Sequence, residues 1–161
     1  MAKEIERKFL VSGQRWRTFA DEGIAIRQAY IVAQDDRSLR VRLYGDGRAR
    51  LTLKVGHTML VRDEYEFDVD RDEAEDMLRH AIGNVIEKVR YRVPYEGHVW
   101  EVDVYGGVHR GLVIAEVELS SIHDEPALPN WVGREVTGES RYSNQSMALG
   151  ASTGESLHQL T

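Results

Sequence analysis

Residues 1–10 have the sequence MAKEIERKFL, and the alternation inside this stretch is the feature that points to the fold. Successive side chains of a β-strand point to opposite faces, so a strand here carries Glu4, Glu6 and Lys8 on one face. Ile5 lies on the other face, and Phe9 continues that apolar side. Two neighbouring carboxylates repel each other. Taken alone, the stretch is also typical of a solvated strand face. The pattern in the rest of the chain decides whether these charges face solvent or belong to a charged site.

Composition narrows the class of protein. The chain has 161 residues, of which 42% are hydrophobic and 30% charged, which is typical of one globular domain with a substantial core. It contains no cysteine, which excludes a disulfide framework and a cysteine-based zinc site and is compatible with the cytoplasm. The net charge of -6 argues against a basic nucleic-acid surface.

Membrane association is not expected either. No apolar run approaches the ~20 residues of a membrane-spanning helix. The beginning of the chain lacks the basic and then apolar layout of a signal peptide. We therefore expect no membrane and no nucleic-acid partner.

The hydrophobic pattern predicts eight strands and two or three helices in one domain over residues 1–150. The expected strands cover residues 1–10, 24–32, 38–44, 48–55, 60–69, 86–95, 99–105 and 112–120, and the expected helices cover 13–22, 72–82 and 139–149. Most strands are joined by hairpin signals such as Gly45-Asp46-Gly47, which predicts a largely antiparallel sheet that closes into a barrel. Residues 151–161 are rich in Ser, Thr and Gly and are expected to form a flexible tail.

Charge is sorted by strand. The acidic pairs are Glu4/Glu6, Glu64/Glu66, Glu101/Asp103 and Glu116/Glu118, and the basic pairs are Arg40/Arg42 and Lys88/Arg90, with Lys8 and Lys54 in addition. An ordinary solvated face mixes Thr, Ser, Gln, Lys and Glu instead. The opposite faces are apolar and must be covered, and the helices are the available cover. Helices packed outside a closed eight-stranded barrel would leave the charged faces pointing into its lumen.

A lumen full of charge is costly unless each charge is paired or ligated. Clustered carboxylates suit a hard divalent cation such as Mg²⁺ or Mn²⁺. Clustered Arg and Lys side chains suit phosphate oxygens, and Arg adds a planar bidentate fork. A polyphosphate held together with its metal ion is the simplest guest that needs both sets.

With these motifs in hand, residues 2–149 resemble the CYTH superfamily, the triphosphate tunnel metalloenzymes. The motif of highest specificity is the opening E-x-E-x-K, followed in register by R-x-R, T-x-K, E-x-E, K-x-R, E-x-D and E-x-E; these are Glu4, Glu6 and Lys8, Arg40 and Arg42, Thr52 and Lys54, Glu64 and Glu66, Lys88 and Arg90, Glu101 and Asp103, and Glu116 and Glu118. The opening residues and the Arg-Glu-Val-Thr at 134–137 are most similar to the compact bacterial members.

The resemblance implies an eight-stranded antiparallel tunnel that hydrolyses a triphosphate with a divalent metal. By position, the metal ligands would be Glu4, Glu6, Glu116 and Glu118. The phosphate ligands would be Lys8, Arg40, Arg42, Lys54 and Arg90. The supporting acidic residues would be Glu64, Glu66, Glu101 and Asp103. Lys88 would orient or deprotonate the attacking water, with Glu4 and Glu6 also catalytic. As a base, Lys88 needs a pKa lowered by cationic neighbours such as Arg90 and Arg92.

Several alternatives stay open at this point. The leading hypothesis is hydrolysis of inorganic tripolyphosphate to pyrophosphate and phosphate. The others are a class IV adenylyl cyclase, a thiamine or nucleoside triphosphatase, and a polyphosphate-binding module without catalysis. The sequence leaves open whether two chains pair into a homodimer through their outer faces. Arg92 matches no family motif, and Arg141 with Tyr142 is a candidate closure of one tunnel end.

Overall fold

The computed structural model describes residues 2–56 and 61–150, and of residues 2–4 and 61 it describes the backbone alone. In chain order the elements are β1 (Ala2–Val11), the 3-10 helix η1 (Arg15–Phe19), β2 (Ile24–Ala33), β3 (Arg37–Tyr44), β4 (Ala49–Val55), β5 (Val61–Asp68), α1 (Arg71–Leu78), β6 (Ile82–Tyr95), β7 (His98–Tyr105), the 3-10 helix η2 (Gly107–His109), β8 (Val113–Glu118), β9 (Val132–Glu135), the 3-10 helix η3 (Ser140–Tyr142) and α2 (Asn144–Leu149). None of the helices in these ranges is long and apolar enough to cross a bilayer.

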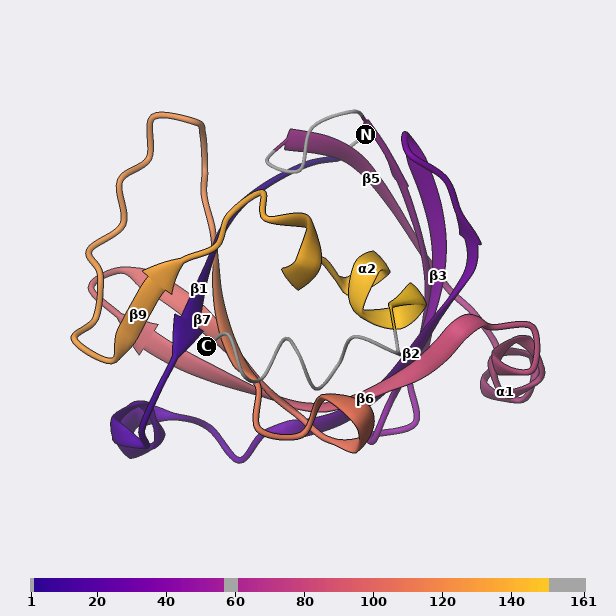
Figure 1. Cartoon of the computed structure of the whole chain (residues 1–161), viewed down its shortest axis with the longest axis horizontal. Helices are drawn as coiled ribbons and strands as arrows, with labels where there is room; N and C mark the ends of the chain where they lie inside the picture. Colours follow the sequence, from indigo (N-terminus) through magenta and orange to yellow (C-terminus); the bar gives the residue numbers. More distant parts are fainter. Residues whose placement is uncertain (1, 57–60, 151–161) are drawn as a thin grey trace.

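The strands curl into a ring, seen end-on in Figure 1. The sheet order is β5-β4-β3-β2-β6-β7-β8-β1-β9, and the recorded pairings are antiparallel. Strand β1 pairs with β8 through residues 6–10 and with β5 through residues 2–5. The opening stretch of the sequence therefore brings the two ends of the sheet together, which explains why the fold depends on it.

The expectation of a closed eight-stranded barrel is correct in its strand arrangement and too strong in its closure. The ladder between β1 and β5 covers only four residue pairs, so the ring is joined at one end of these strands and not along their length. The sequence also gave no indication of β9, whose residues Val132 and Glu135 pair with the later part of β1.

The outer face of the ring is apolar and is covered from several sides. Trp16 of η1, Trp100 of β7 and Trp131 before β9 belong to one buried cluster, and the rings of Trp100 and Trp131 meet edge to face with centroids 5.8 Å apart. Ala74 and Met77 of α1 pack on a second cluster with strands β2, β3 and β4. Both helices lie outside the ring in Figure 1, as the sequence predicts.

The last helix is different, because α2 lies within the ring in Figure 1. Its residues Met147 and Ala148 are fully buried in a third cluster with Leu10, Ile86 and Ile114. These strand residues have the same parity as Lys8, Lys88 and Glu116, so they belong to the inner face of the strands. The inner face is thus charged along one part of the strands and apolar along the other, and α2 packs on the apolar part.

Local sequence signals explain most element boundaries. The side chain of Asp70 accepts hydrogen bonds from the backbone N–H groups of Asp72 and Glu73 and caps α1. The predicted helix 72–82 is nevertheless shorter, ending at Leu78, because β6 begins at Ile82. Gly83 has a positive φ of 74°, and a Cβ there would lie 2.2 Å from the carbonyl oxygen of Ala148. Glycine at this position permits the close approach of α2 to β6.

Two other predicted helices are also shorter than expected. The interval 13–22 contains only η1, and the interval 139–149 is divided into η3 and α2. Ser143 separates the last two, and its side chain accepts a hydrogen bond from the N–H of Ser146 at 3.0 Å. The predicted tail at 151–161 lies outside the described residues.

Candidate active site

Two adjoining cavities occupy the charged part of the ring. The tunnel cavity has a volume of about 210 Å³ and is lined by Glu6, Arg40, Arg42, Tyr44, Arg50, Lys54, Glu64, Glu66, Arg90, Glu101, Glu116, Glu118 and Asn144. The mouth cavity has about 230 Å³ and lies beside the start of α2, with Lys8, Tyr30, Arg62 and Thr137 in its wall. Glu6, Lys54 and Asn144 line both. A charged, elongated ligand in one cavity would therefore border on the other.

The acidic wall comes from the neighbouring strands β1 and β8. In the sheet register Glu6 lies opposite Glu118, and Lys8 lies opposite Glu116. The Lys8 ammonium is 3.5 Å from a carboxylate oxygen of Glu116. Burial opposes ionisation of Glu116, but Lys8 and Arg90 outweigh it and lower its pKa to about 2. Glu116 is therefore a carboxylate throughout the physiological range, as a ligand for a cation must be.

The basic wall comes from β3, β4 and β6, with Arg40, Arg42, Lys54 and Arg90. Burial is the main cause that lowers the pKa of Arg42 to about 10, and the nearby Arg40 and Arg90 guanidinium groups lower it further. Arg42 stays charged at neutral pH even so. Three guanidinium groups gathered around one cavity repel each other, and a bound polyanion would relieve that repulsion.

Behind the basic wall lies a buried ion cluster. Arg90 Nε and Nη2 donate to the two carboxylate oxygens of Asp103 at 2.7 and 2.8 Å, and Lys88 Nζ lies 2.7 Å from Asp103 Oδ2. Burial lowers the pKa of Lys88 to about 7, and Arg90 and Arg42 lower it against the opposing effect of Asp103. The pKa of Lys88 is thus lowered as the sequence leads us to expect, with burial as the largest cause and Arg90 and Arg42 as the cationic neighbours that add to it.

The structure brings together most of the residues chosen from the sequence. The predicted residues that line the tunnel cavity are Glu6, Arg40, Arg42, Lys54, Glu64, Glu66, Arg90, Glu101, Glu116 and Glu118. Lys8 lines the mouth cavity. Lys88 and Asp103 are among the lining residues of neither cavity and are 3% and 1% exposed. The side chain of Glu4 lies outside the described residues, and its backbone position pairs with Arg62 of β5.

A comparison with known protein families decides the assignment. The model of the CYTH domain family matches residues 2–151. The chain belongs to the CYTH domain family. An inorganic triphosphatase of Acetivibrio thermocellus is 44% identical to this CYTH protein over 148 residues, covering 91% of this chain and 94% of the relative. An inorganic triphosphatase of Nitrosomonas europaea is 35% identical over 153 residues, covering 91% and 97%.

Solved structures agree with the sequence relationship. The crystal structure of an inorganic triphosphatase superposes on this CYTH protein with a TM-score of 0.64 at 34% sequence identity. The superposition covers 92% of this chain and 96% of that one. The ring of strands described above is therefore shared with that structure.

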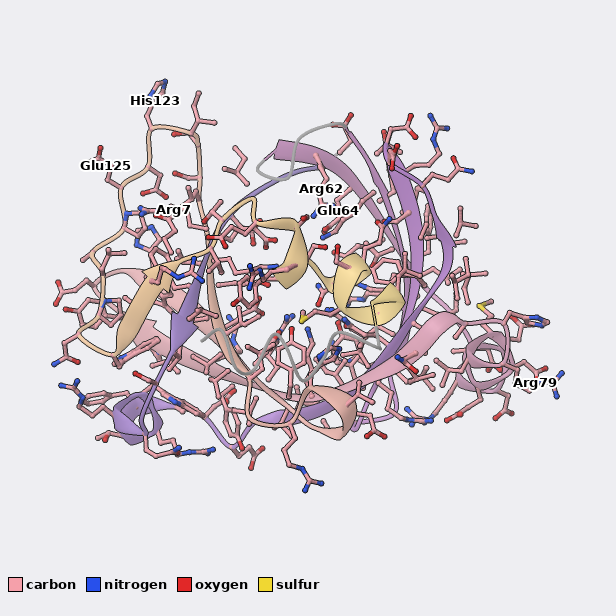
Figure 2. The ribbon with its side chains drawn as sticks, in the orientation of Figure 1. Arg7, Arg62, Glu64, Arg79, His123 and Glu125 are labelled. Atoms are coloured by element: carbon pink, nitrogen blue, oxygen red, sulfur yellow. The ribbon has the colours of Figure 1, made fainter. Side chains whose placement is uncertain are left out.

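Sequence reasoning missed several residues in and beside this CYTH site, and five of them bear on its chemistry. Arg50 and Arg62 line the cavities and share the parity of Lys54 and of Glu64, so the period of two contained their signal. Figure 2 shows Arg62 and Glu64 of β5 pointing to the inside of the ring. The other three are Tyr44, Asn144 and Gln28. Gln28 lies in a mainly apolar strand, and Asn144 lies outside the strands, so the charge pattern gave no signal for either.

Two basic residues that had no motif are now located. Arg92 is 3.8 Å from Glu101 through Nη1 and its side chain is 59% exposed, so it lies at the rim of the ring. Arg141 is in η3, with its guanidinium 5.7 Å from the ring centroid of Tyr142. Tyr142 is fully buried, and its carbonyl oxygen accepts a hydrogen bond from Lys8 Nζ at 3.0 Å. Tyr142 thus helps to fill this end of the ring, and closure by Arg141 stays a prediction.

The CYTH family implies a divalent metal, and the donors present fit one in their chemistry. Glu6, Glu116 and Glu118 are oxygen donors on adjacent strands, as Mg²⁺ and Mn²⁺ prefer. Among the described side chains, no group of three or more His, Asp or Glu residues is already gathered tightly enough to hold an ion. The side chain of Glu4 is not among those described.

Proposed function

We propose that this CYTH protein hydrolyses inorganic triphosphate to pyrophosphate and phosphate with the help of a divalent metal ion. The observation that carries the proposal is the lining of the tunnel cavity. Arg, Lys and Glu side chains together line this cavity, which has a volume of about 210 Å³. This inventory suits a polyphosphate chain and a cation together. The two inorganic triphosphatases that are 44% and 35% identical over nearly the whole chain support it.

Phosphate binding is assigned to Arg40, Arg42, Lys54 and Arg90 in the tunnel cavity, with Lys8 at its mouth. Guanidinium groups donate in pairs to phosphate oxygens, and the three arginines come from two different parts of the ring. Such a clamp holds the chain of phosphates in line with the attacking water and neutralises charge on the oxygens of the transferred group.

The metal is assigned to Glu4, Glu6, Glu116 and Glu118. A bound Mg²⁺ or Mn²⁺ would supply Lewis-acid stabilisation of the phosphate oxygens. What the chain itself contributes is a set of carboxyl groups, of which Glu116 is kept ionised by Lys8 and Arg90.

Lys88 is assigned an indirect part in the reaction. Its ammonium is buried against Asp103, and Asp103 in turn receives two hydrogen bonds from Arg90. Burial raises the pKa of Asp103, but Arg90 and, to a smaller extent, Lys88 outweigh it, so Lys88 helps to keep ionised the carboxylate that orients Arg90. A direct role as proton acceptor would need Lys88 to reach the water, and its side chain has no exposed area.

Inorganic triphosphate is favoured over nucleotide substrates by the character of the cavity walls. Tyr44 is the one aromatic side chain among the described residues that line the tunnel cavity. A nucleobase or thiamine ring usually needs a stacking or apolar surface, and here the remaining lining residues are charged or amide side chains. Location in the cytoplasm and pairing of two chains stay predictions.

The test is phosphate release by the purified protein from tripolyphosphate, ATP and thiamine triphosphate. Each substrate is assayed with Mg²⁺, with Mn²⁺ and with EDTA, and cyclic AMP is measured in the ATP samples. We expect metal-dependent release from tripolyphosphate that far exceeds release from the other two. Cyclic AMP with pyrophosphate would instead establish a cyclase, and binding without turnover would establish a polyphosphate-binding module.

A further inference from the structure

Arg42 is held by a partner that no charge pattern reveals. Gln28 of β2 lies directly opposite Arg42 of β3 in the sheet register. The amide oxygen of Gln28 accepts hydrogen bonds from Arg42 Nε, at 2.8 Å, and from Arg42 Nη2. Two donors on one edge of the guanidinium fix both its plane and its direction. Gln28 takes two of the five N–H groups of the guanidinium, Tyr44 is a further hydrogen-bond partner of Arg42, and the remaining N–H groups are available to a ligand in the tunnel cavity.

The contact with Gln28 holds Arg42 in place against repulsion from neighbouring cations. Arg42 is packed beside Arg40 and Arg90, and both of them disfavour its charge. A guanidinium surrounded by like charges would turn away from them unless it is held. Gln28 is fully buried and uncharged, so it accepts from Arg42 without neutralising it. A carboxylate in the same place would pair with Arg42 and compete with phosphate oxygens for it.

The orientation of Gln28 is fixed in turn by the last helix. Gln28 Nε2 donates to Oδ1 of Asn144, the first residue of α2, at 3.1 Å. If the amide of Gln28 were rotated by half a turn, its NH₂ group would face the N–H groups of Arg42, donor against donor. The acceptor on Asn144 therefore stabilises the same orientation of Gln28 that Arg42, which has only donors, requires.

Asn144 itself is well anchored. Met147 and Ala148 of the same helix are fully buried on the apolar part of the ring. The carbonyl oxygen of Met147 lies 2.9 Å from His109 Nε2, and Ala148 lies directly over Gly83. The helix thus has a fixed position, and Asn144 transmits this position to Gln28.

We propose that Gln28 is a positioning residue for triphosphate binding, which aims Arg42 into the tunnel cavity and is itself oriented by Asn144 of α2. The proposal rests on the function proposed above and adds two residues outside the charged motifs. If it is correct, the full phosphate affinity of Arg42 on β3 depends on the docking of α2.

The test is a double-mutant cycle between Gln28→Met and Arg42→Met. Methionine keeps a similar length and lacks the amide. Because a hydrogen bond to a charged group contributes more than a neutral one, we expect Q28M to raise KM for tripolyphosphate about tenfold or more, with a smaller effect on kcat. In the R42M background the same Q28M substitution should change KM no further. A merely structural role of Gln28 predicts equal losses in both backgrounds, and that result would overturn the proposal.

A matched control and a second cycle guard against misfolding. Gln34→Met makes the same chemical change at an exposed glutamine just after β2 and should leave KM and the melting temperature unchanged. Asn144→Ala should raise KM less than Q28M does, and the Q28M/N144A double variant should be no worse than Q28M alone. If R42M binds too weakly to be measured, this second cycle decides, and a multiplicative loss in the double variant contradicts the proposal.

Failure of the two proposals can be told apart. Tripolyphosphate binding is measured by calorimetry for the wild type and each variant, in parallel with turnover. A wild-type protein that binds and does not hydrolyse tripolyphosphate would contradict the proposed function, and the cycles would then be evaluated on dissociation constants. Unchanged affinity and unchanged KM in a folded Q28M variant would refute the positioning role alone.

Discussion

The inner face of the ring has two parts that share the same strands and differ in their side chains, which are charged in one part and apolar in the other. On β1, β6 and β8 the charged part contributes Lys8, Lys88 and Glu116, and two residues along the same strands the apolar part contributes Leu10, Ile86 and Ile114. Side chains at i and i+2 of a strand share a face, so a step of two residues converts a charged cavity into a packed core. Stability and chemistry are therefore separated along the strands, with one face serving both.

The two parts differ in what a substitution costs. Buried ion pairs seldom stabilise a fold by more than well-packed apolar residues would, because desolvation offsets their attraction. Removal of one partner from such a pair leaves the other charge buried and is strongly destabilising. In the apolar part, by contrast, each methylene group that is removed costs its transfer free energy and the cavity left behind.

The largest expected effect is a loss of activity from substitutions of the proposed ligands. Glu4→Gln, Glu6→Gln and Arg42→Ala each remove one proposed ligand of metal or phosphate, and tripolyphosphate hydrolysis should fall about 100-fold or more while the proteins stay folded. Steady-state kinetics and thermal unfolding check this. Activity equal to that of the wild type in all three variants would contradict the proposed tunnel site.

Matched controls come from the outer surface. Arg79, which follows α1, and Glu125, in the loop before β9, point away from the ring in Figure 2. Arg79→Ala and Glu125→Gln make the same chemical changes without touching either cavity, and both variants should hydrolyse tripolyphosphate like the wild type.

The next largest effect is on stability, from the buried ion cluster. Asp103→Asn removes the carboxylate that Lys88 and Arg90 share, so the unfolding free energy should fall by about 3–5 kcal/mol. Urea unfolding measures it. Adding Arg90→Met to this variant removes a buried guanidinium that stays charged and has lost this carboxylate, and it should recover part of the loss. A change below about 1 kcal/mol would mean that Asp103 is not the counter-ion of the cluster.

Acid should act on the same cluster. Burial raises the pKa values of Asp103 and Glu116, but the neighbouring cations outweigh it and hold both below those of the unfolded chain. Below about pH 5 the unfolded chain therefore binds more protons than the folded one, and the unfolding free energy decreases as the pH is lowered. For Glu116 this continues down to its folded-state pKa of about 2. Urea midpoints between pH 7 and 3 should fall less steeply in Asp103→Asn than in the wild type.

The smallest expected effect comes from the apolar part. Ile114→Val deletes one methylene from a side chain that is 1% exposed, so the unfolding free energy should fall by about 0.5–1.5 kcal/mol. The kcat/KM for tripolyphosphate should be unchanged. A loss of activity without a loss of stability would show that the two parts are not separate.

The sequence was most informative where the period of two is long and charged. The strands around Arg42, Glu66 and Glu116 were found with boundaries close to those observed, because like charges at i and i+2 are seldom accidental. The same parity contained Arg50 and Arg62, so a stricter use of the pattern would have included them. Lys88 and Asp103 were selected by motif, although their position behind the cavity wall was not foreseen.

What the sequence did not reveal depends on contacts between distant segments. Gln28 matters because the register sets it opposite Arg42, and Asn144 because α2 packs inside the ring. Strand β9 is four residues long and is formed by pairing with β1. Short elements of this kind depend on tertiary contacts for their stability, and local propensity does not mark them.

The double pairing of β1 has a consequence for biosynthesis. Residues 2–11 leave the ribosome well before their partners in β8, which begin only at Val113. At roughly 5–20 residues per second, the roughly 100 intervening residues take about 5–20 s to be made. During that time β1 has an unpaired edge, the state of a strand that is most prone to pair wrongly. Strand β1 is thus synthesised long before its pairing can be completed, and a chaperone that binds the nascent chain would have this stretch to protect.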